Sequence, residues 1–173
     1  MMEVISYNDL KKRITGEADK KLSVRSSGIL NYLFTTRMVV SSGKGVCHIT
    51  SDALSMLGTM TRNPEVGDIV AVINTGIYLL VGFSDKDETA ICARIEMSPE
   101  FVYKIPSFTV TEEPNDLKSS FNKFPVGNMF VLRKGLFDMK EVLQLYDKFK
   151  VIWSTIRKLR IESNVHEKEI DNG

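Results

Sequence analysis

The sequence is poor in the residues on which enzymes most often rely. Its 173 residues include only two histidines and two cysteines. There is no C-x-x-C pair and no H-E-x-x-H helix, so neither a structural zinc site nor a zinc protease is predicted. Cys47 and His48 are neighbours, and on a strand neighbouring side chains point to opposite faces, which prevents a nucleophile–base pair. We therefore predict a protein that is not an enzyme, with no cofactor and no metal.

Long apolar runs are also absent. No stretch approaches the ~18 to 20 apolar residues that span a bilayer. The start, MMEVISYNDLKKR, lacks the basic residues followed by an apolar segment that mark a secretory signal. Without such a signal, Cys47 and Cys92 are predicted to be reduced thiols rather than a disulfide. These features predict a cytoplasmic protein that does not contact membranes.

The small net charge of +1 conceals an uneven distribution. Residues 1–44 carry eight Lys and Arg against four Asp and Glu, whereas residues 45–116 carry four against eleven. Residues 117–173 are basic again, with eleven against seven. A polyanion would be attracted to both flanks and repelled by the middle of the chain.

Two helix starts are well marked. Ser6 is placed to cap a helix over 7–15, with Asp9 near its positive end. Asp138 is placed to cap a longer helix over 138–162, with Glu141 at its third position. The last residues, 164–173, show no core pattern and are predicted to be a flexible tail.

Between these helices the pattern is mostly β. Strands are predicted at 31–41 and 45–50 around a turn at 42–45, followed by a short helix over 51–60 with Ser51 as its cap. Three consecutive antiparallel strands are predicted at about 68–73, 77–84 and 89–96 because the segments between them are short and turn-like. Weaker patterns predict strands at 101–105, 107–111 and 128–133 and a short helix over 114–121.

The segment DIVAVI alternates apolar residues on both of its faces. Val70 and Val72 fall on one face. Ile69, Ala71 and Ile73 fall on the other face. A strand that is apolar on both sides is expected to be buried on both sides, as under a helix.

The stretch around this segment resembles the KOW/Tudor group of SH3-like barrels, which open with a valine-glycine-aspartate turn and a V-x-V strand ending in glycine. The matching residues are Val66, Gly67, Asp68, Val70, Val72 and Gly76. The match spans about twenty residues, and an ordinary buried meander fits them equally well. In size, barrel stretch and basic flanks the chain also resembles phage early DNA-binding proteins of the MotB type.

The predicted fold is α+β. The resemblance implies a small SH3-like β-barrel, and the caps and apolar spacing add a short N-terminal helix and a long C-terminal amphipathic helix. The implied organisation is a basic helix and loop (1–27), an SH3-like KOW/Tudor-like domain (28–112), a connecting helix and strand (113–137), the long helix (138–163) and a flexible tail (164–173).

Phosphate binding requires several cations that follow a nucleic-acid backbone. The predicted nucleic-acid-binding residues are Lys11, Lys12, Arg13, Lys20, Lys21, Arg25, Lys148, Lys150, Arg157, Lys158 and Arg160. A simpler interpretation is also open for the N-terminal group. It would be a solvated helix and loop whose field is moderated by Glu17 and Asp19.

The C-terminal helix has apolar residues at heptad spacing. Val142, Phe149 and Ile156 form one series, and Leu145, Ile152 and Leu159 form the other. Three heptads favour a homodimer through this helix. Tyr146 and other residues widen the stripe, so a helix lying across the protein's own sheet is an open alternative.

The sequence thus predicts a non-catalytic DNA-binding protein that contacts duplex DNA mainly through phosphates. The resemblance adds that it is phage-encoded, acts in the host cytoplasm or nucleoid, and affects transcription or nucleoid organisation. The alternative is a protein-interaction module that binds RNA polymerase or another host factor through the acidic barrel.

Overall fold

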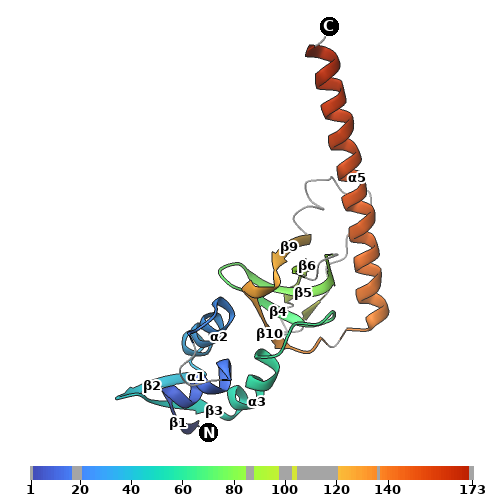
Figure 1. Ribbon diagram of the computed structural model, residues 1–173. Coiled ribbons are helices and arrows are strands. Elements are labelled where there is room, and N and C mark those ends of the chain that lie inside the picture. Colours follow the sequence, from blue (N-terminus) through green and yellow to red (C-terminus); the bar gives the residue numbers. More distant parts are fainter. Residues whose placement is uncertain are drawn as a thin grey trace.

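The computed structural model describes residues 2–16, 21–84, 88–97, 103–104, 121–135 and 137–171. The fold is α+β. A three-stranded sheet with three helices forms the N-terminal end, a five-stranded sheet follows, and the last helix crosses that second sheet and extends beyond it (Figure 1).

The N-terminal part contains three strands and three helices. Its antiparallel sheet has the order β1-β3-β2. Leu10, Leu33, Ile49 and Met60 are fully buried between these elements. The elements are β1 (Met2–Ser6), α1 (Tyr7–Thr15), α2 (Val24–Thr35), β2 (Val39–Gly43), β3 (Val46–Thr50) and α3 (Ser51–Met60).

Helix α2 corrects one prediction, because its last turns occupy residues that were predicted to be strand. The Ser23 hydroxyl accepts a hydrogen bond from the Ser26 N–H at 3.1 Å and so caps the start of the helix. Ile29 and Leu33 are buried in the core at helical spacing. The β-branched and aromatic residues within 31–41 favour a strand locally, but burial of the α2 face that carries Ile29 and Leu33 favours a helix. The strand begins only at Val39.

The second sheet has five strands in the order β10-β4-β5-β6-β9. The predicted meander is confirmed, since β4, β5 and β6 pair consecutively and antiparallel. Short connections join β4 to β5 and β5 to β6. The strands are β4 (Ile69–Val72), β5 (Gly76–Phe83), β6 (Thr89–Arg94), β9 (Phe121–Pro125) and β10 (Met129–Arg133).

The predicted closed SH3-like barrel is wrong. Among the residues that the structure describes, β9 and β10 are the two ends of the sheet and do not pair with each other, so the sheet is open. Pro125 has no N–H to donate, and the 3₁₀ turn η1 (Val126–Asn128) leads directly into β10. Phe124 and Val126 next to this turn pack against the hydrophobic core of the sheet.

The structure also places the other predicted strands that fall within its described residues. Strands β2 and β3 pair with each other, and β3 also pairs with β1, in a sheet separate from that of the meander. Tyr103–Lys104 (β8) pairs with Glu96–Met97 (β7) within the segment predicted as a weak strand. The predicted strand at 107–111 lies outside the described residues, as does the predicted helix over 114–121 up to Ser120, and Phe121 begins β9.

The predicted burial of both faces of DIVAVI is confirmed. Ile69 lies in the core shared with α2 and α3, and Ala71 and Ile73 pack against that core. Val70 and Val72 lie in a second core formed by side chains of the sheet's own strands. Strand β4 therefore has a hydrophobic core on each side.

The helix α5 (Met139–Asp171) begins where the cap predicted it, because the Lys140 N–H donates to Asp138 Oδ1 at 3.0 Å. Among its described side chains, Val142, Leu145 and Phe149 are buried and pack on β5, β6 and β9. The prediction of an apolar stripe that runs along the whole amphipathic helix needs correction. Among its described side chains the packed stripe covers only these first turns, and Leu159 is 48% exposed. The helix also continues through 164–171, which was predicted as tail.

A glycine allows α5 to approach the sheet closely. A Cβ atom added to Gly82 of β5 would lie 2.5 Å from the Tyr146 ring of α5. No real side chain tolerates this contact without displacing the ring or the helix. By contrast, Gly58 in α3 has open space around its missing Cβ.

We expect Gly82→Ala to lower the free energy of unfolding by about 1–3 kcal/mol, the usual cost of overpacking. Gly58→Ala is the matched control, and it should raise stability by up to about 1 kcal/mol because alanine favours the helix. Urea unfolding monitored by circular dichroism measures both changes. In a double-mutant cycle, Tyr146→Ala should remove most of the Gly82→Ala penalty. Additive losses would contradict the close approach.

Candidate nucleic-acid interface

Helix α1 holds the first group of predicted cations. It begins at Ser6, whose hydroxyl accepts a hydrogen bond from the Asp9 N–H at 3.0 Å, as predicted. It ends at Gly16, which has a φ of 84° and donates its N–H to the Lys12 carbonyl at 2.7 Å. Leu10 and Ile14 are buried and fix the helix to the core. Both ends and one face of the helix are therefore held in place.

The first turn of α1 carries the exposed acid Asp9, and its last turn is basic. Lys12 and Arg13 are exposed, and Lys11 lies with its Nζ 5.7 Å from the centre of the Tyr7 ring. Lys12 and Arg13 line a hollow together with Glu3 and Asp9, but within the described part of the chain neither cation forms an ion pair with a carboxylate. Cations in the last turn of a helix also suit its negative end.

The cations around the start of α2 have different environments. Lys20 lies outside the described residues, and Lys21 is exposed. Arg25 donates from Nε to the Met129 carbonyl at 2.9 Å and from a terminal nitrogen to the Val126 carbonyl at 3.0 Å. Partial burial lowers the pKa of Arg25. Its guanidinium therefore joins α2 to η1 and β10.

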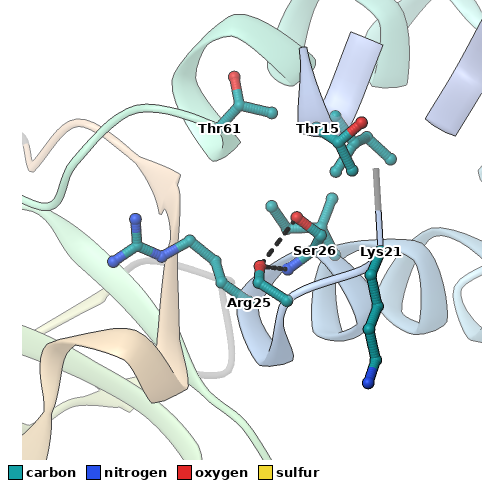
Figure 2. A pocket seen from close by; sticks show the side chains of 8 residues that line it. Thr15, Lys21, Arg25, Ser26 and Thr61 are labelled. Atoms are coloured by element: carbon teal, nitrogen blue, oxygen red, sulfur yellow. Dashed lines mark hydrogen bonds between the residues drawn. The ribbon is translucent and has the colours of Figure 1, made fainter. Parts of the chain in front are cut away.

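A small hollow lies between α1, α2 and the end of α3. Its volume is about 210 Å³, and Figure 2 shows the side chains around it. Lys21 points away from Ser26, and Arg25 extends toward the second sheet. The hydroxyl groups of Ser23 and Ser26 bond to each other at 3.0 Å. The two cations therefore do not converge on the hollow.

The second group of predicted cations lies on α5. Lys150 places its Nζ 4.4 Å from the centre of the Tyr146 ring, and Lys148, Arg157 and Lys158 are exposed. The side chain of Arg160 lies outside the described part of the structure. Figure 1 places α1 and the projecting end of α5 far apart, on opposite sides of the second sheet. The described cations of α1 and those of α5 therefore do not form one surface.

The structure also contains a cation–aromatic cluster that the sequence analysis missed. Lys123 of β9 places its Nζ 4.8 Å from the centre of the Trp153 ring and 6.0 Å from that of Phe149. Phe149 in turn stacks on Trp153, with ring centres 5.9 Å apart. Lys123 is separated from both rings along the chain, so no local spacing indicates the contact.

The cysteine and histidine predictions agree with the structure. Cys47 and Cys92 are both free and buried. Cys47 packs in the core, whereas His48 is half-buried on the other face of β3, so the two side chains point apart as predicted. Burial raises the pKa of the Cys92 thiol to about 12.

Two observations concern other classes of site. None of the described helices has both the length and the apolar character needed to cross a membrane. In the same residues, no three His, Cys, Asp or Glu side chains gather as metal ligands would.

The chain matches no known protein-family model, no curated protein and no solved structure.

The placement of Arg25 predicts a structural role. Arg25→Met keeps the apolar stem but leaves two carbonyls without their charged donor, so stability should fall by about 1.5–3 kcal/mol. Lys21→Met is the control, and as an exposed substitution it should change stability by no more than about 0.5 kcal/mol. Equal effects in thermal unfolding would contradict the assignment.

The raised pKa of Cys92 predicts a pH effect of defined sign. The thiol keeps its proton in the folded protein at pH values where the unfolded chain has lost it. Its contribution to stability should be present below pH 9 and lost as the pH rises from 9.0 to about 12. In a Cys47→Ala background, the remaining thiol should react with a disulfide reagent at pH 8 only after denaturant is added. Rapid reaction of the folded protein would contradict its burial.

Proposed function

We propose that this chain is a non-catalytic DNA-binding protein that contacts the phosphates of duplex DNA through helix α1. The observation that carries the proposal is the exposed pair Lys12 and Arg13 on a helix that is capped and packed on its other face. Lys11 extends this surface, and Lys21 follows in the next described segment.

Two physical features of α1 support phosphate binding. First, its backbone is already ordered, so binding restricts only the exposed side chains. Second, Lys12 and Arg13 have no carboxylate partner within the described residues, so no ion pair there must break before a phosphate binds. Each cation that neutralises a phosphate releases counterions, which makes the binding sensitive to salt.

Phosphate contacts fix position on a duplex but carry no sequence information. The proposal therefore predicts similar affinity for unrelated duplexes, which suits a broad effect on transcription or on nucleoid organisation in the cytoplasm. Arg25 is left out of the proposed interface because its guanidinium is bound to backbone carbonyls. The cations of α5 belong to a separate surface.

The test is a substitution of Lys12 and Arg13 by glutamine. The double variant should bind every duplex more weakly, and the log–log slope of affinity against salt should fall by about 1.8, or 0.9 for each lost contact. Fluorescence anisotropy with two unrelated duplexes at four salt concentrations measures both quantities.

The matched control is Lys134→Gln with Lys140→Gln, which removes the same charge from exposed residues near the start of α5. This control should keep most of the affinity and the parent slope. Equal losses in both variants would mean that net charge, not α1, governs binding. Unchanged binding by the Lys12 and Arg13 variant would refute the proposal and favour a protein partner.

A further inference from the structure

A hollow of about 350 Å³ lies between β1, β3, α1 and α3, beside the two cations of the proposed interface. This β1 hollow has an apolar floor, since Ile49 is fully buried and Ile5 and Leu54 are half-buried. Its volume is at the lower end of the ~300–1,000 Å³ that small-ligand sites occupy. It therefore has room for one flat ring system but not for a nucleic-acid duplex.

The rim of the β1 hollow carries charges of both signs. Glu3, Asp9, Lys12 and Arg13 line it, all four are exposed, and none of them forms an ion pair within the described residues. Carboxylates only accept hydrogen bonds, whereas ammonium and guanidinium groups only donate them. A simple anion or a metal ion would suit one pair of these residues and be repelled by the other. An occupant that suits all four brings both a negative group and N–H donors.

The open edge of β1 supplies backbone groups to the same place. Tyr7 donates its N–H to the Gly45 carbonyl at 2.8 Å, so these residues form a hydrogen-bonded pair. Such pairs alternate along an antiparallel ladder, and the N–H and C=O groups of Val4 therefore point away from β3. No strand in the described part of the chain pairs with this edge, and Val4 lines the β1 hollow. One main-chain donor and one acceptor are thus open to an occupant.

We propose that the β1 hollow binds one unpaired base of a DNA strand whose phosphates are held by Lys12 and Arg13. This binding rests on the proposed function and adds to it a preference for DNA with unpaired nucleotides. A nucleotide combines the groups that the hollow accommodates: an anionic phosphate, two apolar ring faces, and a ring edge with N–H donors and acceptors. Enzymes that take a base out of a duplex hold it by apolar side chains and by hydrogen bonds to its Watson–Crick edge. In a blunt duplex this edge is already paired, so only the phosphate contacts operate there.

The two carboxylates favour particular bases. Guanine presents two neighbouring N–H donors on its Watson–Crick edge, and the carboxylate of Glu3 or Asp9 can accept both. Cytosine and adenine each present one amino group. Thymine presents one N–H between two carbonyl oxygens, which a carboxylate repels. Guanine should therefore bind most tightly and thymine least tightly.

Fluorescence anisotropy of the full chain with three DNA probes tests the proposal. The probes share one duplex, which is blunt or carries a short single-stranded overhang of guanine or of thymine. The guanine probe should bind at least about five-fold more tightly than the thymine probe, which is the lower end for a good bidentate base contact. Free deoxyguanosine monophosphate at millimolar concentration should not compete, because it lacks the neighbouring phosphates. Strong competition would assign the β1 hollow to a free nucleotide and overturn the proposal.

Glu3→Gln with Asp9→Asn separates base recognition from simple repulsion. Removing two acids beside the cations should tighten binding to the blunt duplex, because the phosphates are repelled less. The same variant should lose the preference for guanine over thymine, since neither amide offers a carboxylate. If the two acids only repelled DNA, all three probes would bind more tightly and the preference would stay. An unchanged preference in the folded variant would therefore overturn the proposal.

The matched control is Asp147→Asn with Glu162→Gln, which removes the same charge from exposed positions of α5 and should keep the preference. Circular dichroism melting verifies folding, and Glu3→Gln alone replaces the double variant if Asp9→Asn unfolds α1. A parent that binds the blunt duplex but binds the guanine and thymine probes equally would overturn base binding and leave phosphate binding intact. A parent that binds none of the probes would instead refute the proposed function, and base binding with it.

Discussion

Burial of β4 on both faces is the constraint on which the arrangement of this protein depends. Ile69 faces the core that includes residues of α2 and α3, and Val70 and Val72 face the core formed by the strands of the second sheet. A strand buried on both sides cannot shift by one residue without exchanging the side chains of its two cores. The register of β4 therefore fixes the positions of the neighbouring strands β5 and β10.

A buried ion pair holds the start of this strand. Asp68 is 3% exposed and accepts hydrogen bonds from both terminal nitrogens of Arg62, at 2.7 and 2.8 Å, and from the Glu65 N–H at 2.7 Å. The side-chain hydrogen bond to Asp68 raises the pKa of Arg62. Removing Arg62 would leave the buried carboxylate of Asp68 without its charged partner, which is strongly destabilising. The end of α3 and the start of β4 are joined by this pair.

The candidate interface was predictable in part. The clustering of cations in the first forty-four residues indicated α1 correctly as an exposed basic helix, because Leu10 and Ile14 leave the other positions to solvent. The same reasoning could not distinguish Arg25 from Lys21. Arg25 reaches carbonyls of residues more than a hundred positions later in the chain. The contact of Lys123 with Trp153 was unpredictable for the same reason.

The sequence by itself determined the helix starts at Ser6 and Asp138, because the capping hydrogen bonds are local. It also determined the meander and the two apolar faces of β4, through the turn residues and the order of apolar side chains along each strand. These features depend on residues a few positions apart. Only the tertiary structure decided that residues 31–35 are helical, that the sheet stays open and that α5 packs for its first turns. Each of these outcomes depends on which other element packs against a given helix or strand. Such contacts join residues that are distant in the sequence.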